Sequence, residues 1–141
     1  MKARVITSSN RAAAGVYADT GGPIIVERLR EWGYAVDEPV VVADGAPFGA
    51  ALRSAVADAC DVVISTGGTG ISPTDVTPEH TREVLDREIP GIAEAIRAYG
   101  ARAGVPTAVL SRGLAGVAGR TLVVNLPGSS GGVKDGLAVL E

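Results

Sequence analysis

Residues 61–79 read Asp-Val-Val-Ile-Ser-Thr-Gly-Gly-Thr-Gly-Ile-Ser-Pro-Thr-Asp-Val-Thr-Pro-Glu, and this stretch decides the fold. Its first residues, 61–64, form a short β-branched run that is typical of a strand buried on both faces. A glycine-rich segment follows. Thr77 then resembles a helix N-cap, with Pro78 at the first helical position, where its missing N–H is harmless. The stretch therefore predicts a strand, a glycine loop and a helix.

The glycine loop predicts a binding site for an anion. Three of its four residues from 67 to 70 are glycines, so backbone amides can approach a ligand with no Cβ in the way. The loop opens beyond the carboxyl end of a strand, where α/β sheets bind anions. A P-loop and a dinucleotide fingerprint are both disfavoured, because the required lysine and third glycine are missing. The predicted phosphate-binding residues are Thr66, Gly67, Gly68, Thr69 and Gly70.

Two aspartates follow predicted strands and are candidates for holding a cation. Asp75 lies five residues beyond Gly70, and Asp44 closes the strand predicted over 34–42. Magnesium usually takes one or two carboxylates plus substrate oxygens, and the carboxyl ends of parallel strands share one edge of a sheet. Two plainer interpretations stay open: Asp75 as the cap of a tight turn, and Asp44-Gly45 as a turn dipeptide.

The composition bounds the function. At 141 residues the chain predicts one domain, 1–141, large enough for its own core. No long apolar run predicts a membrane span, and the start lacks a secretory leader, so the cytoplasm is the expected compartment. The net charge of −3 and the absence of a Lys/Arg run disfavour nucleic acid as a partner. One cysteine and one histidine cannot build a zinc cage.

Strands and helices alternate along the chain. This pattern predicts an α/β fold of three layers, with a mostly parallel sheet and helices on both faces. Loops are expected from Ser8 to Asp19, and His80 is expected to be solvated in an exposed first turn. The predicted strands are 4–8, 34–42, 61–64, 107–111 and 120–125, and the predicted helices are 23–32, 47–59, 77–86, 92–103 and one after Gly128.

Three motifs resemble a known family in their order and spacing. Residues 66–70 read Thr-Gly-Gly-Thr-Gly, residues 75–79 read Asp-Val-Thr-Pro-Glu, and residues 86–91 read Asp-Arg-Glu-Ile-Pro-Gly. Together they resemble the signature of the MoaB/Mog proteins of molybdenum cofactor biosynthesis, relatives of the gephyrin G domain. The similarity runs from Val5 to about Lys134. Family members typically carry an aspartate where this chain has Asn10.

The resemblance implies a fold, an activity and a set of site residues. The activity would be Mg-ATP-dependent adenylylation of molybdopterin, a nucleotidyl transfer that releases pyrophosphate, with ATP and molybdopterin as substrates. Asp44 and Asp75 would act in catalysis and bind Mg2+. The residues implied on the pterin side are Ser111, Arg112, Asn125, Pro127, Gly128 and Ser129. The resemblance also implies a homotrimer, and it leaves open a separate molybdenum insertase as a partner.

Two other functions remain open at this stage. A member of the same family could bind and carry molybdopterin without adenylylating it. An unrelated nucleotide or phosphosugar enzyme could use the same sheet-edge geometry, but it would have to account for both the Asp-Val-Thr-Pro-Glu and the Asp-Arg-Glu-Ile-Pro-Gly motifs at the family spacing. Retention of both aspartates favours the enzyme over the carrier.

Overall fold

The computed structural model describes residues 1–16 and 18–141, and its centre is a seven-stranded mixed sheet. The strands run in the order β2-β1-β4-β7-β6-β5, and β3 also pairs with β1. The strands are β1 (Lys2–Ser8), β2 (Ala35–Val36), β3 (Val40–Val42), β4 (Val62–Thr66), β5 (Arg87–Glu88), β6 (Ala115–Ala118) and β7 (Thr121–Leu126). The helices are α1 (Asn10–Ala13), α2 (Gly21–Glu31), α3 (Ala46–Ala57), α4 (Thr77–Val84), α5 (Pro90–Arg102), η1 (Pro106–Leu110) and α6 (Ser130–Leu140).

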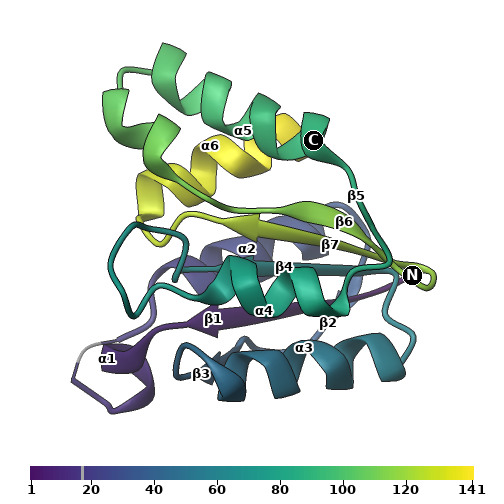
Figure 1. The fold of residues 1–141 in the computed structure, drawn as a ribbon. Helices are drawn as coiled ribbons and strands as arrows, with labels where there is room; N and C mark the ends of the chain where they lie inside the picture. Colours follow the sequence, from purple (N-terminus) through teal and green to yellow (C-terminus); the bar gives the residue numbers. More distant parts are fainter. Residues whose placement is uncertain (17) are drawn as a thin grey trace.

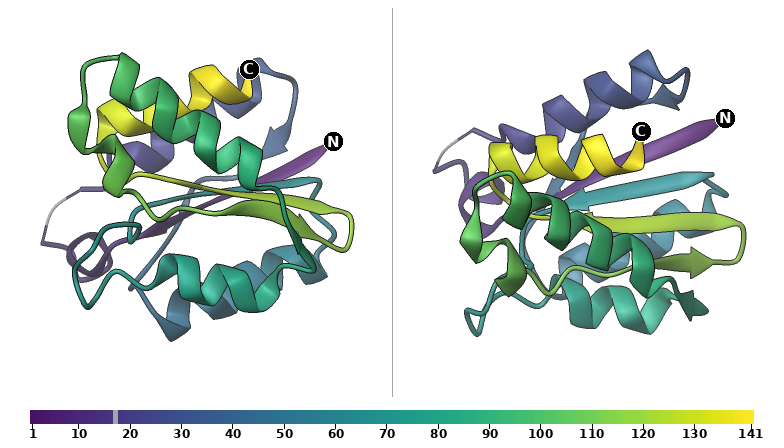
Figure 2. Two further views of the ribbon diagram at one scale, coloured as in Figure 1. Left: turned by 45° about the horizontal axis from the view of Figure 1, so that its top comes forward. Right: turned by 90° about the horizontal axis from the view of Figure 1, so that it is seen from above.

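Three layers are visible in Figures 1 and 2, with α2, α5 and α6 on one side of the sheet and α3 and α4 on the other. The central strands β1, β4 and β7 are parallel and in register, so that Ile6 pairs with Ser65 and Ser65 with Asn125. The three-layer α/β prediction is therefore confirmed. The shared register brings the carboxyl ends of these strands to one edge of the sheet.

Each face of the sheet has its own apolar core. Val5, Ile64 and Val124 pack against the first core cluster, which α2 and α6 complete with Ile25, Leu29, Val133 and Leu137. Successive residues of a strand point to opposite faces, so Ile6, Val63 and Val123 pack on the other side against Phe48 and Leu52 of α3. Strands covered on both sides need continuous apolar runs, which is what the sequence of β4 provides.

The strand predicted over 107–111 is wrong. Residues 106–110 form the 3₁₀ helix η1, which packs on α5, where a Cβ on Gly100 would lie 2.8 Å from the Cβ of Ala108. The strand predicted over 120–125 is found as β7, and its antiparallel partner β6, which reads Ala-Gly-Val-Ala, was not predicted. Small residues have low strand propensity, so β6 depends on its position beside β7 and gave no signal of its own.

The strand predicted over 34–42 is divided into β2 and β3, which both pair with β1. Residues 37–39 separate them, and Pro39 has no N–H to donate to a continuous ladder. The loop predicted between Ser8 and Asp19 contains the short helix α1, and Tyr17 of that loop lies outside the described residues. On α5, Ala93, Ile96 and Gly100 are buried while Tyr99 is exposed.

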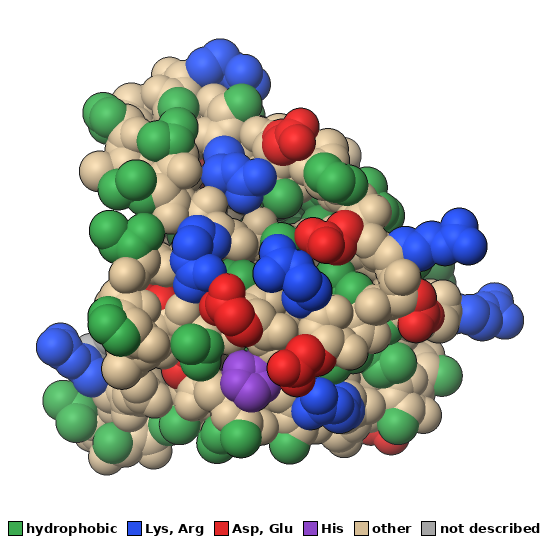
Figure 3. All heavy atoms as spheres, viewed as in Figure 1, with side chains coloured by type: hydrophobic (Ala, Val, Ile, Leu, Met, Phe, Trp, Pro, Cys, Tyr) green, Lys and Arg blue, Asp and Glu red, His purple; other side chains and the backbone are tan. Residues whose placement is uncertain are grey.

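The helices that the structure describes include none with the length and apolar character that a bilayer crossing requires. On the face seen in Figure 3, acidic, basic and apolar side chains lie interspersed.

Candidate functional site

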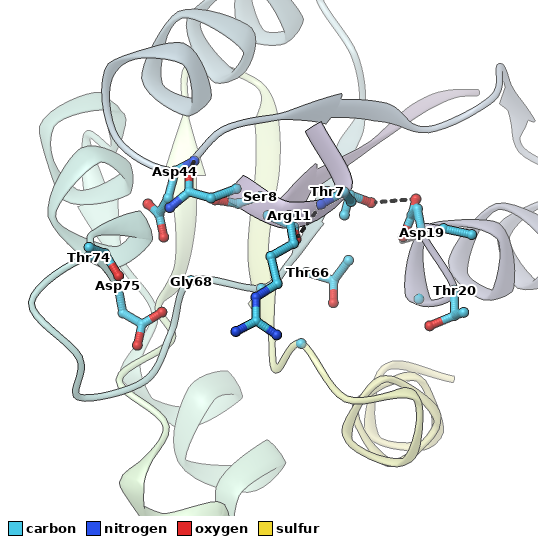
Figure 4. A pocket seen from close by; sticks show the side chains of 17 residues that line it. Thr7, Ser8, Arg11, Asp19, Thr20, Asp44, Thr66, Gly68, Thr74 and Asp75 are labelled. Carbon is cyan, nitrogen blue, oxygen red and sulfur yellow. Dashed lines mark hydrogen bonds between the residues drawn. The ribbon is translucent and has the colours of Figure 1, made fainter. Parts of the chain in front are cut away.

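A polar pocket of about 340 Å3 lies at the carboxyl ends of β1 and β4. Six predicted residues line it: Asp44, Thr66, Gly67, Gly68, Asp75 and Gly128. Figure 4 shows Asp44 and Asp75 on one side of this pocket, Asp19 and Thr20 on the other, and the side chain of Arg11 between them. Arg11 is the only Lys or Arg among the described residues that line the polar pocket.

The glycine loop needs its glycines, as the sequence predicts, but the space that Gly68 leaves free is filled by a side chain of the protein. Gly67 and Gly68 have φ of +92° and +68°, in the left-handed region that favours glycine. A Cβ on Gly68 would overlap Asp44 Oδ2 and Thr77 Oγ1, so the missing side chain makes room for the Asp44 carboxylate. The prediction that Thr77 caps α4 is wrong, because Val76 occupies the N-cap position and no side chain caps the helix. The side chain of Thr77 contacts Ser8 and Asp44 instead.

One backbone amide of the glycine loop donates a hydrogen bond within the described protein, and three do not. The Gly67 N–H donates to Leu126 O over 3.1 Å, which ties the loop to the end of β7. Among the hydrogen bonds of residues 1–16 and 18–141, none uses the N–H of Gly68, Thr69 or Gly70. These three amides border the site without a protein acceptor, which is the arrangement that an anion requires.

Asp44 is half-buried and held by several donors. Its Oδ1 accepts from the N–H of Gly45 at 2.8 Å, from the N–H of Val76 at 3.3 Å and from Thr77 Oγ1 at 3.5 Å. Burial raises the pKa of the Asp44 carboxyl above its ordinary value, and the nearby negative charge of Asp75 raises it further. The backbone N–H of Asp44 donates to Asn10 Oδ1 at 3.0 Å, so the amide at position 10 still serves as an acceptor.

Asp75 faces both the polar pocket and a second cavity beyond the loop. Its Oδ2 accepts from the Ser72 N–H at 3.1 Å, so the turn-capping interpretation describes part of its role. The structure brings the two predicted aspartates together, because each lines the polar pocket and the charge of one affects the pKa of the other. In the described residues no three acidic, His or Cys side chains form a metal cage. Two carboxylates fit Mg2+, which takes its remaining ligands from water and substrate.

The second cavity, here called the apolar pocket, has a volume of about 450 Å3 and lies between the glycine loop, α5, η1 and the start of α6. It shares Gly68, Asp75 and Gly128 with the polar pocket. Its predicted members are Thr69, Gly70, Ser111, Pro127, Gly128 and Ser129, and its lining also includes Ile96, Leu110 and Arg97. A ligand in each pocket would therefore meet the other at Gly68 and Asp75.

Two predicted substrate residues lie elsewhere. Asn125 is 3% exposed, and its Nδ2 donates to Ser65 Oγ and Thr81 Oγ1 while its Oδ1 accepts from the Leu114 N–H. It lines neither pocket and joins strands inside the sheet. Arg112 also lines neither, because its guanidinium turns away to bond Glu79 and loop carbonyls. The donors of Arg112 are thus directed at Glu79 and at the carbonyls of Gly70 and Asp75.

The structure adds pocket residues that the sequence reasoning missed, among them Asp19, and it corrects the predicted exposure of His80. Asp19 accepts from Thr7 Oγ1 at 2.9 Å and from the Gly22 N–H at 3.0 Å, and it borders the polar pocket. An aspartate three residues before Gly22 at a helix start is a capping signal that could have revealed it. His80 is half-buried, whereas the sequence predicted it to be solvated. Because Gly49 has no side chain, α3 and α4 approach each other closely, and the Nδ1 atom of His80 is buried between them.

Comparison with known proteins identifies the family of the chain. Residues 4–141 match the family model described as "Probable molybdopterin binding domain". The chain belongs to this molybdopterin-binding family. The MoaB/Mog resemblance seen in the sequence is thereby confirmed.

Members of the family are similar to this chain in sequence and in structure. A molybdopterin adenylyltransferase of Helicobacter pylori is 36% identical over 138 residues, which cover 93% of this chain and 76% of that protein. A solved structure of MogA is 61% identical and superposes with a TM-score of 0.97 over 99% of this chain and 92% of its own. The Mog protein of Mycobacterium ulcerans is 59% identical, with a TM-score of 0.94 over 99% and 91% of the two chains.

Proposed function

We propose that this chain is a molybdopterin adenylyltransferase of molybdenum cofactor biosynthesis. An oxygen of the terminal phosphate of molybdopterin attacks the α-phosphorus of ATP, the bond from that phosphorus to the α–β bridging oxygen breaks, and pyrophosphate leaves. The observation that carries the proposal is the meeting of two pockets at Gly68 and Asp75. A transfer between two bound molecules needs two adjoining sites with the reacting groups at their junction.

The reaction brings two anions together, so the protein must neutralise charge and fix positions. The free amides of Gly68, Thr69 and Gly70 would bind phosphate oxygens at the junction, and Arg11 would add a positive charge to the polar pocket. Asp44 and Asp75 would hold Mg2+, which when bound supplies positive charge to the phosphates of ATP. Both carboxylates are preset by their own hydrogen bonds.

The pterin side of the site is assigned to the apolar pocket. Its lining of Ile96, Leu110 and Pro127 suits a flat heterocycle, and Ser111, Gly128 and Ser129 would face the pterin phosphate. Ser129 Oγ caps α6 by accepting from the Gly132 N–H, so the start of that helix is ordered toward the site. Arg112 and Asn125 would not contact the pterin, because Arg112 binds loop carbonyls and Asn125 binds Ser65 and Thr81.

The chain is proposed to act as one domain, 1–141, because every described strand joins one sheet.

A homotrimer in the cytoplasm, with a molybdenum insertase using the product, completes the proposal. Apolar side chains that a lone chain leaves exposed outside both pockets support self-association, with Val16 70% and Val109 63% exposed. Light scattering of the purified protein should give three times the chain mass, and a monomer mass at working concentration would contradict the trimer.

The experiment for the activity is incubation of the purified protein with molybdopterin, ATP and Mg2+, followed by detection of adenylylated molybdopterin and pyrophosphate. The enzyme forms both products, and Asp75→Ala abolishes them while its circular dichroism stays that of the parent. A carrier of the same family would bind molybdopterin tightly and form neither product. Thermal-shift screening separates ligand classes first, because a bound ligand raises the apparent melting temperature by mass action.

A further inference from the structure

One arginine connects the two ends of the exposed loop that carries Asp75. Arg112 Nε donates to Gly70 O at 2.9 Å, and its Nη2 donates to Asp75 O at 2.6 Å. The backbone N–H of Arg112 donates to Thr69 O at 2.8 Å. A single residue beyond η1 therefore contacts the last part of the glycine loop and the backbone of the aspartate itself.

Glu79 of α4 completes this arrangement. Its Oε2 lies 2.7 Å from Arg112 Nη1 and its Oε1 lies 3.2 Å from Arg112 Nη2, which is a two-pronged carboxylate–guanidinium pair. Glu79 is also the last residue of the Asp-Val-Thr-Pro-Glu motif, one helical turn beyond Asp75. The hydrogen bond from Arg112 holds the pKa of Glu79 below its ordinary value, so the pair is ionised at neutral pH.

The segment between the two ends of the loop has little else to hold it. Residues 71–74 are all exposed, and Ile71 is 72% exposed. Within the described chain, the contacts that fix Asp75 from outside the loop are those to Arg112, since its Oδ2 and N–H both bond Ser72 of the same segment. The N–H of Val76, the next residue, donates to Asp44 Oδ1, and Arg112 binds the carbonyl of Asp75 itself. Arg112 thus supplies the contact that holds Asp75 from the side away from Asp44.

We infer that Glu79 and Arg112 are positioning residues, which hold the Gly70–Asp75 loop so that the Asp75 carboxylate stays at the junction of the two pockets. The inference rests on the proposed function for the step that Asp75 serves. It assigns Arg112 a different role from substrate binding, because its donors are directed at carbonyls and at Glu79 and it borders neither pocket. Glu79 in turn fixes the plane of the guanidinium.

The chemistry of the two side chains explains why they suit this role. A guanidinium presents donors in a rigid planar fork, so one group can bind two carbonyls and a carboxylate at once. A lysine ammonium at position 112 would keep the charge but could not reach three acceptors in the same plane. Arg112→Lys therefore removes the geometry and keeps the electrostatics, and Glu79→Gln removes the charge and keeps the shape.

The chain offers a matched control on the same helix. Glu83 lies one turn beyond Glu79 on α4 and pairs with Arg53 at 3.3 Å, with both side chains more than half exposed. Glu83→Gln thus removes a surface ion pair of α4 that has no contact with the Asp75 loop. Circular dichroism and the melting temperature of all three variants establish that they are folded.

Two measurements test the inference. The first is kcat and KM for AMP transfer at saturating Mg2+. The second is the affinity for Mn2+, measured by electron paramagnetic resonance on the complex with α,β-methylene-ATP, which cannot release pyrophosphate. We expect Arg112→Lys to lower kcat about tenfold and Glu79→Gln several-fold, since a displacement of about 1 Å can cost ~10²-fold in rate. The KM for molybdopterin should stay within twofold in both, and Mn2+ affinity should fall in both.

The outcomes are distinct. Variants that match Glu83→Gln in kcat and in Mn2+ affinity would overturn the positioning role. A raised KM for molybdopterin at unchanged kcat would make Arg112 a direct substrate contact and would also overturn it. If the parent protein transfers no AMP, the proposed function fails, and the Mn2+ affinities still decide the inference: weaker binding in both variants supports the positioning role, and equal binding refutes it.

Discussion

The sharpest consequence of the structure concerns Gly68→Ala. The missing side chain of Gly68 makes room for the Asp44 carboxylate, because a Cβ there would lie 3.0 Å from Asp44 Cγ and overlap Oδ2. Carbon atoms in ordinary contact are about 3.5–4.0 Å apart, so the carboxylate must retreat by roughly 0.5–1 Å. Displacement of a reacting group by about 1 Å can cost on the order of 10²-fold in rate.

The backbone strain of this substitution is a separate effect and has its own control. Gly68 has φ of +68°, where an alanine costs roughly 1–2 kcal/mol of stability. Gly119 has φ of +59° in the turn between β6 and β7, and a Cβ there would meet nothing within 4 Å. Gly119→Ala therefore introduces the same strain without the overlap.

The assay compares kcat for AMP transfer in the two variants, with urea denaturation to measure the free energy of unfolding. Both variants should lose the stability that the backbone strain costs, and Gly68→Ala should lose more because its Cβ also overlaps Asp44 and the buried Thr77. Only Gly68→Ala should lose about 10²-fold in kcat. Equal and near-normal rates in the two variants would refute the claim that Gly68 makes room for a functional Asp44 carboxylate.

Three further changes have defined outcomes. Burial raises the pKa of Asp44, so its ionised form opposes folding above that raised pKa; Asp44→Asn should stabilise the protein against urea at neutral pH, and the gain should vanish as the pH falls below the ordinary aspartate value. An equal or lower stability of Asp44→Asn at neutral pH would contradict this sign. Asn125→Ala leaves buried partners unsatisfied and should cost at least about 2 kcal/mol in the free energy of unfolding, whereas a loss near zero would show that its network is dispensable. Asp75→Ala should abolish AMP transfer with unchanged molybdopterin affinity by calorimetry, and transfer near the parent rate would remove Asp75 from the mechanism.

The sequence predicted the parts of the fold that local patterns determine. The structure contains a strand at the apolar run 62–64 and a helix that buries Ile25 and Leu29, as their spacing predicts. It also contains the loop that the glycines predict. The segments that were misjudged depend on their neighbours. Residues 106–110 contain Val109 and Leu110, which suit a strand, yet they pack as a 3₁₀ turn on α5; β6 is built of small residues that pair only because β7 lies beside them.

In the candidate site, too, some residues could be placed from local sequence patterns and others could not. Asp44 and Asp75 were predictable because both follow parallel strands whose carboxyl ends must share one edge. The directions of Arg112 and Asn125 were not, since only the packed structure determines whether a polar side chain faces a pocket or its own backbone. The family resemblance implied Arg112 on the pterin side, whereas its guanidinium in the structure donates to Gly70 O, Asp75 O and Glu79.

The most direct test of the account follows the α-phosphate of ATP. Molybdopterin, Mg2+ and ATP labelled at the α-phosphorus are incubated with the purified protein, and the products are separated. We predict that the label appears in adenylylated molybdopterin in a one-to-one ratio with unlabelled pyrophosphate. Label recovered in ADP or free AMP, with no labelled pterin, would contradict adenylyl transfer and with it the role assigned to the junction of the two pockets.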